Sequence, residues 1–129
     1  MFRPLSLATA MTLAVVAAAP ALAVVRAPYS DAAFQAAQRA GKPILVEVHA
    51  PWCPVCAAQG RQIDKLTASA YKDLTIFRID FDTQKPLWQK FGAKKQSTII
   101  AYHGAKETGR ISYIADETSM TNLLRSTAS

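Results

Sequence analysis

The sequence predicts one α/β domain, with a mixed sheet of four to five strands and helices on both faces. The length of 129 residues is enough for one compact core and too short for two. Helical and strand patterns alternate along the chain and end in two consecutive strands before a last helix. Half of the residues are apolar and 19% are charged, which excludes a disordered or fibrous chain.

Residues 1–23 have the pattern of a secretory signal peptide, so we place the folded domain at residues 24–129. The apolar stretch that follows Arg3 is shorter than the roughly 20 residues that cross a bilayer as a helix. Small side chains at Ala21 and Ala23 suit a signal peptidase, and we expect cleavage after Ala23 and a periplasmic or secreted protein. The alternative is an uncleaved membrane anchor.

The domain is expected to begin with a helix followed by a buried strand. Residues 31–40 form an amphipathic pattern, which Ser30 can cap and which Gly41 can close in the left-handed conformation. The apolar, β-branched run 44–49 has the pattern of a central strand that is covered on both faces. Its one carboxylate, Glu47, therefore needs a functional or structural reason.

Three more helices and three more strands complete the prediction. The helices are expected at residues 53–66, 86–91 and 117–125, and the strands at 75–80, 98–102 and around 110–114. Pro86 favours a helix start, Gly92 its end, and Asp116 can cap the last helix. The last two strands are predicted to form an antiparallel hairpin, which makes the sheet mixed.

The cysteine pair carries the chemistry. Cys53 lies between a buried strand and the first turn of a helix, where unpaired N–H groups and the helix dipole favour a thiolate. We expect Cys53 to attack a disulfide and Cys56 to displace the product, which leaves the two cysteines bonded to each other. Pro54 suits the first helical turn, and the Trp52 ring can lie beside the exposed sulfur as a platform for substrate. We assign both Trp52 and Pro54 to substrate binding.

On these residues the sequence resembles the thioredoxin superfamily, and most closely its short exported bacterial members. The likeness covers nearly all of residues 30–125, and its most specific motif is a strand followed by Ala-x-Trp-Cys-x-x-Cys, ending at Cys56. The resemblance implies the thioredoxin fold, with a possible short edge strand at residues 24–25. It also implies thiol-disulfide exchange with protein substrates and a separate redox partner.

The resemblance also assigns a role to Glu47. Thioredoxins keep a buried acid six residues before the first cysteine, where Glu47 stands. A desolvated carboxylate can act as the general base when Cys56 must become a thiolate. Arg78 aligns with a cation that accompanies this acid, so we expect a Glu47–Arg78 pair. The alternative is a Glu47 side chain that reaches solvent.

The loop that faces the cysteines departs from the family. Thioredoxins carry a cis-proline immediately before the threonine that opens the third strand, and Ser97 occupies that position here. A cis peptide without proline costs about 2.5–4 kcal/mol, so we expect a trans peptide between Gln96 and Ser97. We assign substrate binding to this loop at Gln96, Ser97 and Thr98. The Ser97 hydroxyl and N–H are candidate donors to a thiolate or a substrate.

The direction of electron flow is predicted from the two residues between the cysteines. Neither Pro54 nor Val55 adds a charge or a donor, which favours a reductant of protein disulfides over a thiol oxidase or isomerase. The same fold could instead serve as a zinc or copper module, or as a redox-silent binding module. The candidate metal ligands would be Cys53, Cys56, His49 and His103.

Composition limits the partners. The net charge is +6, but the positive residues are scattered, so nucleic acid is not an expected partner. Ala57 rather than histidine follows the second cysteine, which excludes a c-type haem. We expect no cofactor, a monomer, and membrane contact only if the N-terminal segment is retained.

Overall fold

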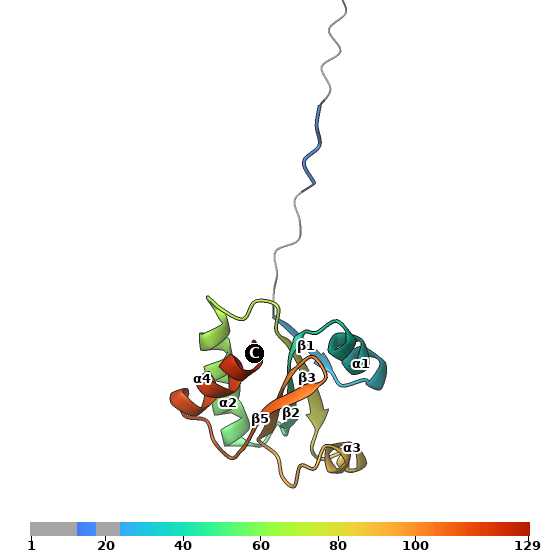
Figure 1. The fold of residues 1–129 in the computed structure, drawn as a ribbon. Coiled ribbons are helices and arrows are strands. Elements are labelled where there is room, and N and C mark those ends of the chain that lie inside the picture. The colour runs from blue at the N-terminus through green and yellow to red at the C-terminus, as the bar shows by residue number, and fades with distance from the viewer. Residues whose placement is uncertain (1–12, 18–23) are drawn as a thin grey trace, which may run out of the picture.

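A five-stranded sheet with the strand order β1-β3-β2-β4-β5 forms the centre of the computed structural model (Figure 1). The structure describes residues 13–17 and 24–129. Its strands are β1 (Val25–Pro28), β2 (Pro43–His49), β3 (Thr75–Asp80), β4 (Thr98–His103) and β5 (Lys106–Ser112), and its helices are α1 (Asp31–Arg39), α2 (Pro54–Thr67), α3 (Lys85–Lys90) and α4 (Glu117–Ser126). β1, β3 and β2 run parallel, whereas β4 and β5 each pair antiparallel. The predicted mixed α/β fold is confirmed.

Helices cover both faces of the sheet, so β2 is a central buried strand, as predicted. Its residues Ile44, Val46 and Val48 pack in one cluster with Phe34 of α1 and Trp88 of α3. The opposite face packs against α2 and α4 (Figure 1). That second cluster contains Leu45, Ile63, Leu74, Ile76, Ile99, Ala101, Met120, Leu123 and Leu124.

The helix boundaries follow the capping signals in the sequence. The Ser30 hydroxyl accepts a hydrogen bond from the Ala33 N–H (3.2 Å) at the start of α1, and Gly41 after this helix has a φ of +67°. The Asp116 carboxylate accepts one from the Ser119 N–H (2.9 Å) at the start of α4. Because these contacts are local, short sequence patterns predict where the helices begin.

The bounds predicted for β5 are wrong at both ends. The strand runs from Lys106 to Ser112, whereas the sequence pattern indicated residues around 110–114. β5 lies at the edge of the sheet and is largely exposed, so its polar sequence lacks the apolar pattern of a buried strand. Tyr113 leaves the strand with a φ of +62°, and its N–H donates to the Ser97 carbonyl (3.3 Å).

The predicted signal peptide at residues 1–23 lies outside the described residues except for 13–17, which form neither helix nor strand. The predicted edge strand at residues 24–25 corresponds to β1, which begins at Val25 and pairs with β3. Within the described ranges, none of the helices has the length and apolar character needed to cross a membrane.

Candidate active site

Cys53 and Cys56 form a disulfide at the N-terminus of α2, with their Cα atoms 5.3 Å apart. Cys53 is the N-cap residue of the helix, and its sulfur accepts a hydrogen bond from the Cys56 N–H (3.1 Å). Pro54 follows in the first turn, where its missing N–H costs no helical hydrogen bond. The pair therefore lies between strand and helix, as the sequence predicted.

The two cysteines are less accessible than expected. Cys53 is only 3% exposed and Cys56 5%, so the expectation of an exposed sulfur at Cys53 is wrong. Both pack with Ala50 and with the partly buried side chains of Val55 and Phe81. Phe81 follows β3, far from the cysteines in sequence, which is why the sequence pattern did not reveal this cover.

Trp52 lies beside the cysteines on the surface. Its side chain is 55% exposed, and its indole N–H donates to both carboxylate oxygens of Asp82 (2.9 and 3.2 Å). The ring also meets the Phe81 ring edge to face, with centroids 6.1 Å apart. Asp82 therefore fixes the orientation of the predicted platform. The sequence analysis missed this residue, because only the fold brings it to the cysteine loop.

The predicted pair of Glu47 and Arg78 is present. The two residues are register partners on the parallel strands β2 and β3, so their side chains share a face of the sheet. One guanidinium nitrogen lies 3.4 Å from a Glu47 carboxylate oxygen. Glu47 is only 4% exposed, so the alternative of a side chain that reaches solvent is wrong. The Arg78 side chain remains 41% exposed.

Burial dominates the electrostatics of Glu47. Desolvation raises the pKa of its carboxyl above the ordinary glutamate value, although Arg78 and Arg26 act in the opposite direction. The same strand approaches the disulfide, as the distance of 4.0 Å between the Val48 carbonyl oxygen and the sulfur of Cys56 shows. Glu47 is therefore a buried carboxyl with a raised pKa, one residue before Val48, whose carbonyl lies beside Cys56.

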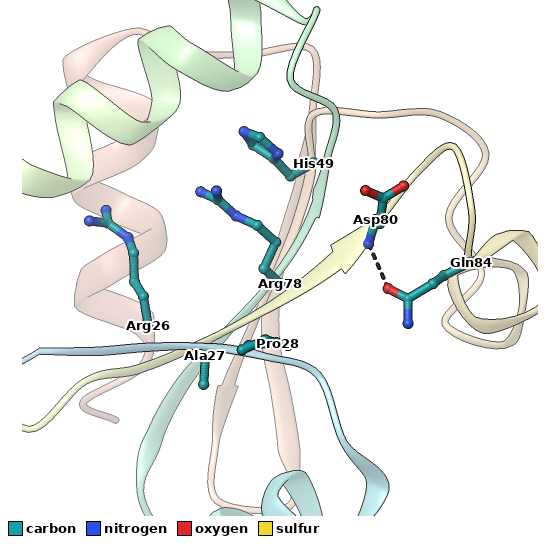
Figure 2. Close-up of a pocket in the computed structure, with 7 residues that line it drawn as sticks. All are labelled: Arg26, Ala27, Pro28, His49, Arg78, Asp80 and Gln84. Atoms are coloured by element: carbon teal, nitrogen blue, oxygen red, sulfur yellow. Dashed lines mark hydrogen bonds between the residues drawn. The ribbon is translucent and has the colours of Figure 1, made fainter.

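A pocket of about 350 Å³ is lined mainly by residues of β1 and β3, among them Arg78. Figure 2 shows Arg26, Arg78 and His49 pointing to the same side of the strands that carry them. Arg26 is held by Asp64 of α2 at 2.6 Å. Desolvation, followed by the charge of Arg78, lowers the pKa of His49, which favours the neutral ring. The pocket lining includes neither cysteine.

The loop before β4 has a trans peptide, as predicted, since the described residues contain no cis peptide bond. Ser97 is fully buried, and its N–H donates to the Val48 carbonyl (2.8 Å), so this N–H is already engaged within the protein. Its hydroxyl accepts from the Tyr113 N–H (3.2 Å). Thr98 is also buried, and its hydroxyl donates to a backbone carbonyl of the same loop. Gln96 is partly exposed, and its amide contacts the Tyr113 hydroxyl (3.4 Å).

Gln59 of α2 is a second residue that the sequence analysis missed. It is 2% exposed, and its amide nitrogen donates to the Ser97 carbonyl (2.9 Å). The sequence contained a sign that Gln59 is buried, because this residue lies between Cys56 and the core residue Ile63 at helical spacing. A polar side chain on that buried face requires a hydrogen-bonding partner.

The predicted alternative of a metal site with four ligands is wrong. His103 lies at the end of β4 that pairs with Pro43, the first residue of β2, whereas His49 ends β2 at the opposite side of the sheet. The His103 ring contacts the Thr127 carbonyl (2.8 Å). Among the described residues, no group of three or more potential ligands is assembled.

Comparison with known proteins assigns this geometry to a family. Residues 25–126 match the family model described as Thioredoxin. The crystal structure of Trxlp from Edwardsiella tarda is 44% identical and superposes with a TM-score of 0.71, over 78% of this chain and 97% of that one. Thioredoxin-2 of Saccharomyces cerevisiae is 31% identical over 70 residues, which are 54% of this chain and 66% of the yeast protein.

Some relatives are much longer than this chain. Protein disulfide-isomerase tigA of Aspergillus niger is 31% identical over 106 residues, which are 80% of this chain and 27% of that protein. The match to the bifunctional thioredoxin reductase/thioredoxin of Mycobacterium leprae, at 29% identity, covers 64% of this chain and 18% of that protein. The chain therefore spans less than a third of the length of these two relatives.

The buried carboxyl predicts a pH-dependent stability. Because the folded state raises the pKa of Glu47, it retains the proton to higher pH than the unfolded chain does. The free energy of unfolding contributed by this group therefore falls as the pH rises past the ordinary glutamate pKa of about 4.3. Glu47→Gln should be more stable than the parent protein at pH 7, and the difference should shrink towards pH 4, as measured by urea unfolding.

Glu107→Gln provides the control for this comparison. It removes a carboxylate whose side chain is 43% exposed and pairs with Arg110 at the surface. It should change stability by at most about 1 kcal/mol, without a gain at neutral pH. A Glu47→Gln protein that is no more stable than the parent at pH 7 would show that burial of the charge carries no cost.

Proposed function

The chain belongs to the thioredoxin family, and on that premise we propose that it is a thiol-disulfide oxidoreductase that acts on proteins. The observation that carries this proposal is the Cys53–Cys56 disulfide at the N-terminus of α2. A bond that closes so short a loop adds little to folding stability, so a redox role explains the pair better than a scaffold role. The buried carboxyl of Glu47 supplies the proton acceptor that such a cycle needs.

The cycle in the reducing direction has two exchange steps. The Cys53 thiolate attacks a substrate disulfide, forms a mixed disulfide and releases one substrate thiolate. Cys56 then loses its proton to Glu47 and attacks the Cys53 sulfur, which restores the internal disulfide and releases the second substrate thiolate. Two electrons have passed to the substrate, and its thiolates take up protons. A separate redox partner returns two electrons to the Cys53–Cys56 disulfide.

We assign direct substrate contacts to the exposed parts of the rim. Trp52 and Pro54 are exposed beside the disulfide, and Gln96 is partly exposed on the facing loop. Ser97 and Thr98 are buried, which favours a role in shaping the loop over direct contact with the substrate. Displacement of the cover around Cys53 by a bound polypeptide would make the sulfur accessible.

The reductant role and export are further parts of the proposal. Pro54 and Val55 bring no charge to the helix start, which supports a reductant over a thiol oxidase or isomerase. The pattern of residues 1–23 supports export, with cleavage after Ala23. N-terminal sequencing of protein recovered outside the cytoplasm should find Val24 first; recovery only inside the cytoplasm would contradict export. We expect the protein to act as a monomer.

Single cysteine variants test the two-step cycle. Cys56→Ser should accumulate a mixed disulfide with a protein substrate, because no internal thiol resolves it. Cys53→Ser should form none and should lose reduction of the substrate. Mass spectrometry and non-reducing electrophoresis detect the adducts. Equal adduct formation by the two variants would contradict the assignment of Cys53 as the nucleophile.

Glu47→Gln tests the proton acceptor. Release of the mixed disulfide should slow at neutral pH, by a factor of about 10²–10⁴ if general base catalysis is lost completely. The initial attack by Cys53 should change less, because Glu47 is assigned to the proton of Cys56. Stopped-flow measurement of both steps separates them, and an unchanged release rate would rule out this role.

The reduction potential tests the direction of electron flow. Equilibration of the Cys53–Cys56 pair with glutathione buffers should give a value of about −270 mV, the level of thioredoxin, rather than the about −120 mV of a strong oxidant. Alkylation of free thiols followed by mass analysis gives the reduced fraction. A potential close to that of the oxidants would reverse the proposed direction and leave the exchange chemistry intact.

A further inference from the structure

One buried side chain of α2 ties together the segment before β4 and the segment after β5. Gln59 is 2% exposed, and its amide nitrogen donates to the Ser97 carbonyl and to the Ile114 carbonyl, each at 2.9 Å. Ser97 directly precedes β4 and Ile114 follows β5. Both N–H bonds of one amide are thus used to hold two segments that lie 38 and 55 residues away in sequence.

These loops need such a tie because each contains a strained backbone. Ser97 and Tyr113 have φ values of +61° and +62°, in the left-handed region that side chains other than glycine and asparagine rarely adopt. Such a backbone conformation persists only where the surrounding contacts hold it. The Tyr113 N–H contacts the Ser97 carbonyl and hydroxyl, so the two strained residues also support each other.

The loop that contains Ser97 is connected to Cys56, the cysteine that displaces the product, through one carbonyl group. The Ser97 N–H donates to the Val48 carbonyl (2.8 Å), and the sulfur of Cys56 lies 4.0 Å from the same oxygen. Gln59 itself lies one helical turn after Cys56 on α2. A connected path of contacts therefore runs from Gln59 to Ser97, to Val48 and back to Cys56.

We propose that Gln59 is a positioning residue for thiol-disulfide exchange: its amide holds the Ser97 and Ile114 loops against the cysteine-bearing end of α2. Loss of the two hydrogen bonds releases the strained loop, and a protein substrate then meets a less ordered surface beside Cys53. The kinetic part of this inference rests on the proposed exchange activity. The structural part, that the amide orders the loop, does not.

Gln59→Met tests the proposal, since it keeps the length of the side chain and removes both donors. Hydrogen exchange measured by NMR should show at least tenfold faster exchange of the Ser97 and Tyr113 amides. The kcat/KM for reduction of insulin disulfides should fall about tenfold, mainly through KM. Reduction of the Cys53–Cys56 disulfide by dithiothreitol, which does not dock on the loop, should not slow.

Gln62→Met is the matched control, because Gln62 lies on the same helix and its buried amide oxygen has no hydrogen-bond partner among the described residues. This variant should match the parent in exchange and kcat/KM. Gln59→Glu provides a second test, since its protonated carboxyl retains one donor and its carboxylate none. Its kcat/KM relative to the parent should fall with rising pH.

The outcomes separate the two proposals. A parent protein that exchanges no disulfide with proteins in either direction contradicts the proposed function, while amide exchange still decides whether Gln59 orders the loop. If the parent is active and Gln59→Met matches Gln62→Met in both amide hydrogen exchange and KM, the positioning role is overturned. If Gln59→Met does not fold, the pH profile of Gln59→Glu decides the same question, and a flat ratio to the parent overturns the role.

Discussion

The burial of β2 between two helical layers is the constraint on which the site depends. Because side chains alternate along the strand, Val48 joins the apolar cluster with α1 and α3, while Glu47 points to the face covered by α2. The strand then leads directly into the loop that ends at Cys53. One buried segment therefore places the acid, the carbonyl beside Cys56 and the start of the helix that carries both cysteines.

Within that strand, the buried position of Glu47 suits a proton acceptor but lowers the stability of the fold. Burying a carboxylate is costly unless it is well paired, and Arg78 offers one contact at 3.4 Å from a half-exposed position. A shorter, fully buried pair would hold the carboxylate ionised and make it a weaker base. The observed arrangement instead raises the pKa of the carboxyl, which makes its ionised form a stronger base. Such a group can exchange a proton during the reaction, at the expense of stability at neutral pH.

Features set by neighbours in sequence could be predicted, and those set by distant contacts could not. The Ser30 and Asp116 caps and the cysteine position follow from short patterns. The Glu47–Arg78 pair came from resemblance to a family. The cover that Phe81 provides over the cysteines and the Gln59 contacts with two loops depend on chain crossings that no local pattern encodes. The bounds of β5 were missed because an exposed edge strand does not need an apolar repeat.

Serine at position 97 changes how the substrate loop is held. Proline has no N–H, whereas the Ser97 N–H donates to the Val48 carbonyl, so the loop is bonded directly to β2. This bond comes with a left-handed backbone at the serine, which the contacts from Tyr113 and Gln59 stabilise. Since Gln59 belongs to the helix that carries both cysteines, its hydrogen bond to the Ser97 carbonyl connects the loop to that helix as well. A proline at this position could still accept the hydrogen bond from Gln59 through its carbonyl, but it could not donate the bond that fixes the loop to β2.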